Sequence, residues 1–325
     1  MKTKTRFAWK QFLKNLAIIA IPVALQNMLT TTGSMIDTMM IAPLGETTVG
    51  AVGLCAQFSS LMFAGYWGFF GGGMLFFSQY WGAQDDDGID HSYGLTLTCM
   101  MIVGLTFGAF AIFAPETVMK LYTDKENIQV IGAEYLRIIG FGYPVQVFSM
   151  AMSALLRSTE RVRIPLFASI ASVASNIFLN WVFIYGKFGL PEMGVRGAAL
   201  ATVIGQGITM AIALVYCAAK KNLALKVAAA GAPKTALRIL KIGLAPFGLT
   251  LAPNISLVII NRFSVSYGGQ EAIAVYACIS YIICIVYLLL QGVGDGSQPL
   301  MSRFYGAGNK KSLKHTKTMA YEFAM

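Results

Sequence analysis

The stretch Leu16-Ala-Ile-Ile-Ala-Ile-Pro-Val-Ala-Leu25, followed by Met35-Ile-Asp-Thr-Met-Met-Ile41, decides the fold of this chain. An apolar run of about 20 residues is long enough to cross a hydrocarbon layer of about 30 Å as a helix. A carboxylate, Asp37, lies inside this run. A charged carboxylate at membrane depth costs about 3 kcal/mol unless a partner offsets it. The stretch therefore predicts a membrane-spanning helix that carries a functional acid.

The composition extends this prediction to the whole chain. Of its residues 56% are hydrophobic and 12% are charged, with a mean hydropathy of +0.62, whereas a soluble domain carries about 25% charged residues. A further apolar stretch begins at Thr318 and has only a few residues before Met325, so we expect the chain to be cut short after the eighth span. The spans are predicted over residues 16–41, 48–80, 93–114, 128–156, 164–186, 196–219, 238–266 and 270–302.

Basic residues predict the orientation of these spans. Most of the 25 Lys and Arg fall in the N-terminal segment and in the segments after the fourth, sixth and eighth spans. Cytoplasmic loops carry such an excess, so we expect the N-terminus to be cytoplasmic. The acidic loop 84–90 is an exception that the rule tolerates, because acidic residues weigh little in it. The net charge of +10 therefore indicates a lipid bilayer as the partner and disfavours nucleic acid.

The chain repeats itself with an offset of 224 residues. Pro22 matches Pro246, and Ser78-Gln-Tyr-Trp-Gly-Ala83 matches Ser302-Arg-Phe-Tyr-Gly-Ala307. Six spans separate the two copies, so both have the same orientation, as in transporters built from parallel repeats. We predict a first lobe over residues 1–219, a cytoplasmic connector over 220–236 and a partial second lobe over 237–325.

Polar residues form stripes on the predicted helices. The first span carries Asn27, Thr30, Thr31, Ser34, Asp37 and Thr38 at spacings of three and four residues. Such a stripe should face a cavity or neighbouring helices. At 1.5 Å per residue, Asp37, Asn180 of the fifth span and Thr202 of the sixth lie at a similar depth, about 6–9 Å below the outer boundary.

A carboxylate, amide carbonyls and a hydroxyl at one depth supply the hard oxygen ligands that an alkali cation prefers. They could equally hold a proton on Asp37. For Ser169, Ser172 and Thr209 we favour ordinary hydrogen bonding between helices. The prolines Pro22 and Pro246 remove backbone hydrogen bonds and could bend their helices.

Several motifs together resemble the MATE (multidrug and toxic compound extrusion) transporters. These are Pro22 with Gln26-Asn27 and Ile36-Asp37-Thr38, the Ser78–Ala83 motif, Asn176-Ile-Phe-Leu-Asn180, Gly194–Thr202, and Gln291-Gly-Val-Gly-Asp295 through Gly308. The resemblance covers essentially the whole chain. It implies an all-α integral membrane protein with two lobes of six spans, in the plasma (inner) membrane of a bacterium. It also implies a monomer that exports drug-like small molecules by antiport with Na⁺ or H⁺ and needs no other cofactor.

The resemblance also implies which residues act. The coupling ion, possible Na⁺ included, would be held by Asp37, Asn176, Asn180 and Thr202. Asn180 departs from the Asp that is frequent there, which should weaken Na⁺ binding. Asp295 stands where Gln is frequent; it could neutralise a cationic substrate or pair with neighbouring side chains. The substrate pathway is expected at Asn27, Ser34, Gln206, Gln291 and Asp295.

Two other functions are weighed against efflux. A lipid-linked precursor flippase of the same superfamily would need a cationic cavity, whereas the intramembrane charges here are mainly acidic. An intramembrane prenyltransferase-like enzyme is suggested by Asp86-Asp87-Gly88-Ile89-Asp90, which fits DDxxD. That motif is short and is expected in a loop without a second acidic partner motif, and His91 and His315 are also expected in loops. A transporter rather than an enzyme is the favoured interpretation.

Overall fold

The computed structural model describes residues 9–219, 237–244 and 297–324, with the separate positions 248, 256, 259, 260, 263 and 294. The connector 220–236 and the predicted site residues Pro246, Gln291 and Asp295 lie outside the described residues. Within the described part, all regular elements are helices. The predicted all-α class is therefore confirmed.

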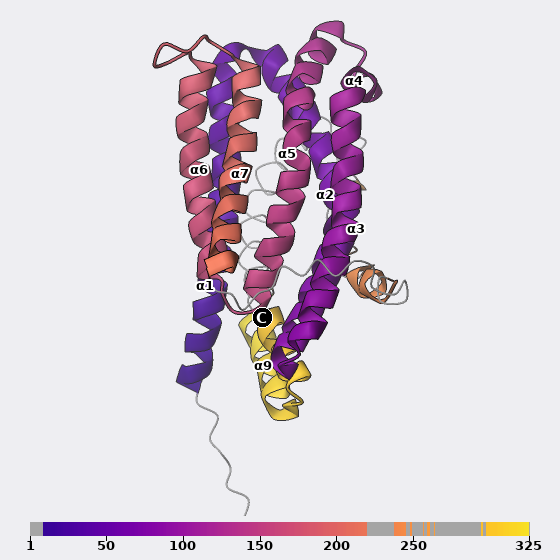
Figure 1. The fold of residues 1–325 in the computed structure, drawn as a ribbon, viewed down its shortest axis with the longest axis vertical. Helices are drawn as coiled ribbons and strands as arrows, with labels where there is room; N and C mark the ends of the chain where they lie inside the picture. The colour runs from indigo at the N-terminus through magenta and orange to yellow at the C-terminus, as the bar shows by residue number, and fades with distance from the viewer. Residues whose placement is uncertain are drawn as a thin grey trace, which may run out of the picture.

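Six long helices build the first lobe, at the positions that the apolar stretches predict. In Figure 1 they run side by side along the long axis of the molecule, up and down in turn. Five of them, α2, α3, α5, α6 and α7, are long and apolar enough to cross a membrane. The helices are α1 (Trp9–Ile41), α2 (Glu46–Ala83), α3 (Asp86–Phe113), α5 (Glu126–Ser158), α6 (Arg163–Ile184) and α7 (Val195–Ala219).

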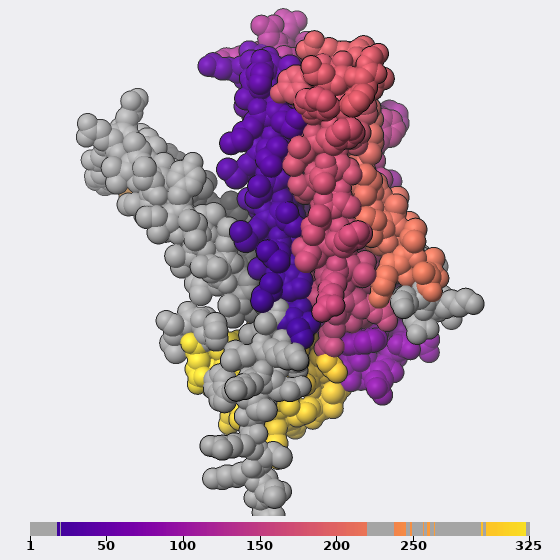
Figure 2. All heavy atoms as spheres, turned by 90° about the vertical axis from the view of Figure 1, so that its left-hand side faces the viewer, coloured from indigo at the N-terminus to yellow at the C-terminus, as the bar shows by residue number. Residues whose placement is uncertain are grey.

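The lobe has a packed interior and an apolar exterior. Large side chains such as Tyr66, Phe77 and Tyr143 are fully buried between α2, α3 and α5. On the outside, Met39 and Phe167 are more than 60% exposed. They belong to α1 and α6, which lie side by side over one face of the molecule (Figure 2). Exposed apolar side chains over a whole face are expected where the solvent is lipid.

Three helices begin earlier than their hydrophobicity indicates, and α1 is one of them, because it begins at Trp9 rather than at residue 16. The acidic stretch 86–90 is the first turn of α3, because the Asp85 side chain caps the helix by accepting a 2.9 Å hydrogen bond from Gly88 N. Likewise α9 (Lys310–Ala324) begins at Lys310 rather than near Thr318, and Asn309 Oδ1 accepts a 3.1 Å bond from Ser312 N. Asx side chains at this position favour a helix start even before charged residues.

The prediction that His91, His315 and the acidic stretch lie in loops is therefore wrong. The two caps also show the internal repeat, since Asp85 and Asn309 are 224 residues apart.

A short helix, α4 (Pro115–Tyr122), joins α3 to α5 and was not predicted. Pro115 occupies its first turn, where the missing N–H costs nothing. It lies at the end of the bundle that also holds the α6–α7 connection (Figure 1). The opposite end holds the α2–α3 and α5–α6 turns and α9, and corresponds to the predicted cytoplasmic side.

Candidate functional site

Three helices bring four of the predicted site residues into one hydrogen-bonded group. Asp37 comes from α1, Asn176 and Asn180 from α6, and Thr202 from α7. Asn180 Nδ2 donates to Asp37 Oδ1 at 2.6 Å and to Asn176 Oδ1 at 3.3 Å. Asn176 Nδ2 in turn donates to Thr202 Oγ1 at 3.3 Å. We call these four residues the Asp37 cluster.

Asn180 is the central member of the Asp37 cluster. It is completely buried, and both hydrogens of its amide are used in the two bonds just described. Its Oδ1 atom is buried and has no hydrogen-bond partner. A buried acceptor in that state costs about 1–3 kcal/mol. The amide oxygen is therefore available to a cation or to a proton donor.

The charge of Asp37 is also incompletely matched. In the described part of the chain the ion pairs are Glu116–Arg137, Glu134–Arg196 and Glu160–Arg303, so Asp37 forms none there. One neutral amide hydrogen bond is a weak substitute for the hydration that a carboxylate loses inside a membrane. The site is thus chemically suited to take up one positive charge.

The donor set fits a hard monovalent cation. The Asp37 carboxylate, the Asn176 and Asn180 carbonyl oxygens and the Thr202 hydroxyl are all oxygen ligands, which alkali cations prefer over nitrogen or sulfur. Among the described residues there is no group of three or more His, Cys, Asp or Glu that could hold a metal ion. With one carboxylate, the cluster does not have the charge that divalent ions require.

Sequence reasoning missed Tyr135 of α5. Its side chain is buried, it is hydrogen-bonded with Thr202, and it is close enough to Asp37 to interact electrostatically with it. The Thr202 hydroxyl also donates to Ala198 O at 3.0 Å. A tyrosine in an apolar span follows no pattern that would have identified it.

The polar stripe of α1 is satisfied within its own helix. The hydroxyls of Thr30, Ser34 and Thr38 each donate to the carbonyl four residues earlier, at 2.9–3.1 Å. Ser34 is exposed and Asn27 is partly buried. The stripe therefore does not hold helices together through these three hydroxyls.

Ser172 forms the hydrogen bond between helices that was expected of it. Ser172 Oγ donates across from α6 to Gly205 O of α7 at 2.7 Å. Thr209 instead donates within α7, so the expectation for that residue is wrong.

The remaining predicted residues lie apart from the Asp37 cluster or within a regular helix. Gln206 Nε2 donates to Gln146 Oε1 of α5 at 3.5 Å, and Gln206 Oε1 is buried without a partner. Pro22 lies inside α1, which continues through it.

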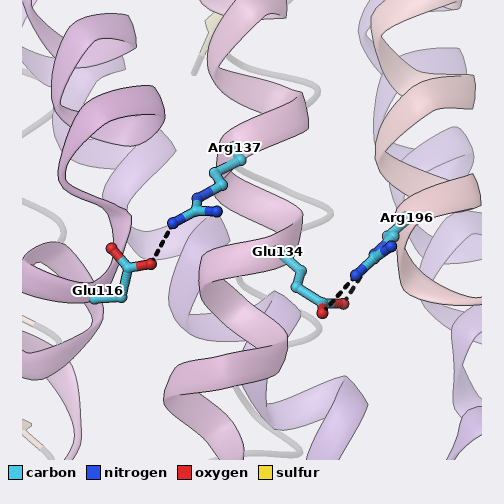
Figure 3. A network of polar contacts seen from close by, with 4 residues as sticks. All are labelled: Glu116, Glu134, Arg137 and Arg196. Atoms are coloured by element: carbon cyan, nitrogen blue, oxygen red, sulfur yellow. Dashed lines mark hydrogen bonds and ion pairs between the residues drawn. The ribbon is translucent and has the colours of Figure 1, made fainter.

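Two ion pairs join helices near the end of the lobe that holds α4 (Figure 3). Arg196 at the start of α7 holds Glu134 of α5 with two bonds, Nε to Oε2 at 3.1 Å and Nη2 to Oε1 at 2.7 Å. Arg137 of α5 reaches Glu116 of α4 at 2.5 Å. Glu134 directly precedes Tyr135, so the first pair connects the two helices that supply Tyr135 and Thr202.

Comparison with known proteins agrees with this architecture. The chain is 25% identical over 312 residues to the probable multidrug resistance protein YoeA of Bacillus subtilis, which covers 93% of this chain and 66% of that protein. It is 26% identical to the probable multidrug resistance protein NorM of Neisseria meningitidis, covering 89% of this chain and 64% of that protein. The chain thus spans about two thirds of the length of these relatives.

Solved structures show the same fold. A crystal structure of MATE in the bent conformation superposes with a TM-score of 0.85 at 22% identity, over 96% of this chain and 69% of that one. An outward-facing multidrug resistance MATE transporter gives 0.82 at 22% identity, again over 96% and 69%. The two-lobe helical fold predicted from the repeat is that of these proteins. The MatE family model matches residues 22–182 and 246–321, and the chain accordingly belongs to the MatE family of membrane proteins.

Proposed function

We propose that this chain is the first lobe and part of the second lobe of a secondary multidrug efflux transporter. It would export cationic or amphipathic small molecules by antiport with Na⁺ or H⁺, in a bacterial plasma (inner) membrane with the N-terminus in the cytoplasm. The multidrug resistance names of its relatives support the substrate class. The observation that carries the coupling proposal is the hydrogen bond between the partly buried Asp37 and the buried Asn180, whose amide oxygen has no partner.

Asn180 offers a simple switch between an occupied and an empty site. In the arrangement seen here its NH₂ group faces Asp37, so the carboxylate is partly satisfied without a cation. Rotating the amide by half a turn would present Oδ1 instead. That oxygen could then coordinate Na⁺ beside Asp37, or accept a hydrogen bond from a protonated Asp37. Binding of either ion thereby changes the bonds between α1 and α6.

This change can be coupled to the transport cycle. A ligand shifts a two-state equilibrium only by its different affinity for the two states, and the Asp37 cluster joins three helices whose relative positions can differ between states. An inward unit charge gains about 2.3 kcal/mol per 100 mV. At about 1.36 kcal/mol per factor of ten, this supports a substrate gradient of about 50-fold.

We propose that polar side chains outside the Asp37 cluster line the drug pathway. Asn27 and Ser34 precede Asp37 on α1, and Gln206 lies one turn beyond Thr202 on α7. Gln291 and Asp295 would complete the pathway from the second lobe. The enzyme interpretation is disfavoured, because the family model and the relatives that match this chain are those of transporters. The flippase alternative is disfavoured by the acidic character of the Asp37 cluster.

The test is drug efflux from vesicles with separately imposed Na⁺ and H⁺ gradients, using the protein at its full length. Asp37→Asn should abolish gradient-driven efflux, because an amide cannot take up the charge. Asp124→Asn, the same change in an exposed residue between α4 and α5, is the matched control and should leave efflux unchanged. Gradient-driven efflux by Asp37→Asn at the parent rate would remove Asp37 from coupling.

A further inference from the structure

We infer that the cytoplasmic ends of the two lobes form a closing seam, latched by the ion pair between Glu160 and Arg303, which must separate when the transport pathway opens to the cytoplasm. This inference rests on the proposed transport function. The seam consists of residues 79–82 of α2, the repeat-related residues 303–306, and the α5–α6 turn.

The centre of the seam is a reciprocal contact between repeat-related residues. A Cβ atom added to Gly82 would lie 2.1 Å from Arg303 O, and one added to Gly306 would lie 1.9 Å from Gln79 O. Gly82 corresponds to Gly306, and Gln79 to Arg303, by the same offset of 224 residues. Gly82 therefore packs on the backbone of the segment that contains Gly306, and Gly306 packs on the backbone of the segment that contains Gly82. This is the pattern that a twofold axis imposes on an interface, and it places the pseudo-twofold axis of the repeat between these segments.

Two small apolar clusters flank this crossing and obey the same symmetry. One joins Phe76 and Leu95 of the first lobe to Ile239 of the second. The other includes Leu300 and Met319, the repeat counterparts of Phe76 and Leu95, packed with Ile19 of α1, which lies one turn beyond position 15, the counterpart of Ile239. The two lobes thus exchange equivalent contacts on both sides of the axis.

The latch breaks this symmetry. Glu160 lies in the α5–α6 turn of the first lobe, with φ of 62°, and its carboxylate pairs with Arg303 Nη1 of the second lobe. A residue other than glycine rarely adopts that backbone conformation, and such positions occur where surrounding contacts require them. The position equivalent to Arg303 in the first lobe is the neutral Gln79, so it offers no second charge of this kind. The two side chains are 44% and 32% exposed, so their attraction is moderate and can be broken in each cycle.

The segments that follow the crossing carry opposite charges. The first turn of α3 has Asp86, Asp87 and later Asp90, whereas the equivalent positions of α9 are Lys310, Lys311 and Lys314. Both helices start from an Asx cap in the same register. Opposite charges on either side of a symmetry axis favour association of the two lobes, and salt screens them.

The test measures opening of the seam directly, without relying on transport. Ser302 is 7% exposed and adjoins Arg303, so Ser302→Cys reports access from the cytoplasm through its rate of reaction with a membrane-impermeant maleimide in inside-out vesicles. The protein without Ser302→Cys gives the background from the native cysteines. We expect Glu160→Gln and Arg303→Gln each to raise the labelling rate by up to about fivefold, the range for a partly exposed ion pair.

The charge-swapped double variant Glu160→Arg/Arg303→Glu should restore slow labelling, because it re-forms the pair. Glu116→Gln is the matched control, since it breaks an ion pair within the first lobe at the other end of the bundle and should not change labelling. Labelling by both single variants at the parent rate would overturn the latch. So would a charge swap that labels as fast as the single variants.

A second measurement covers variants that insert poorly. Glu160→Cys/Arg303→Cys, joined by a short thiol cross-linker, should stop drug efflux, and cleavage of the cross-linker should restore it. Efflux at the parent rate with the cross-link in place would overturn the seam. If the parent shows no efflux but labelling follows the charge pattern, the seam stands and the proposed function fails. If efflux is present and the labelling rate does not depend on these charges, the proposed function stands and the latch fails.

Discussion

Asn180 Nδ2 donates a hydrogen bond of 2.6 Å to Asp37 Oδ1, although 143 positions separate the two residues in the chain. The bond joins the C-terminal half of α1 to the C-terminal half of α6. Asn180 is completely buried and its Oδ1 has no partner, so the pair is polar but not fully satisfied. A polar group in a membrane that lacks part of its hydrogen bonding indicates a functional site, here one for a cation or a proton.

Replacing Asn180 by Asp should tighten the binding of Na⁺ at the Asp37 cluster. The variant puts two carboxylates into the cluster, and a second negative charge stabilises a bound cation. We expect the Na⁺ concentration for half-maximal efflux to fall by about tenfold, which corresponds to about 1.4 kcal/mol. The measurement is efflux against Na⁺ concentration at constant pH. Asn180→Ala, which removes the ligand, should shift the same curve the other way; identical curves for both variants would contradict the assignment.

Removing the Tyr135 hydroxyl should weaken ion coupling without unfolding the lobe. Tyr135→Phe deletes the hydrogen bond to Thr202 and keeps the buried ring. One hydrogen bond contributes about 1 kcal/mol, so the half-maximal ion concentration should rise by about fivefold. Tyr143→Phe is the matched control on the same helix, because Tyr143 bonds with Ser59 at 2.9 Å rather than with the cluster. Equal shifts in the two variants would argue for a general effect of the lost hydroxyls.

A side chain at Gly205 should destabilise the lobe by separating α6 from α7. A Cβ atom there would lie 3.2 Å from Ser172 Oγ and 3.3 Å from Ser172 O, so Gly205→Val should cost about 2 kcal/mol of unfolding free energy through overpacking. Gly207→Val is the control, since a Cβ atom at Gly207 meets nothing within 4 Å. Both changes alter helix propensity equally, so the difference in thermal unfolding in detergent reports packing. A lower stability for the Gly207 variant would contradict this account.

The Glu134–Arg196 pair should orient α5 against α7 but add little to the free energy of unfolding. Both side chains are well exposed, at 39% and 57%, so water screens their attraction. We expect Arg196→Gln to unfold at the parent temperature in detergent. A clear loss of thermal stability would show that the pair is less screened than its exposure indicates.

Much of the fold could be predicted from the sequence, because spanning helices follow from the length of apolar runs. The stretches that predicted α1, α2, α5, α6 and α7 end within a few residues of the observed helices. The starts of α3 and α9 were placed too late, since hydropathy does not register a charged first turn. Asp85 and Asn309 begin those helices through their side-chain caps.

The candidate site was only partly predictable. Depth and residue type brought together Asp37, Asn180 and Thr202, and the family resemblance added Asn176. Tyr135 and the ion pair of Glu160 with Arg303 were not anticipated. Their partners lie on other helices at sequence separations that no local pattern encodes.

The sequence by itself determined the spanning helices, the internal repeat and the presence of an acid at membrane depth. Those features depend on hydrophobicity and on self-similarity, which are properties of the chain. Only the tertiary structure decided that the Asn180 amide faces Asp37, that Tyr135 lies beside Thr202, and that the two lobes meet through Gly82 and Gly306. Such contacts depend on how helices rotate and approach one another, and that is set by side-chain packing between segments far apart in the chain.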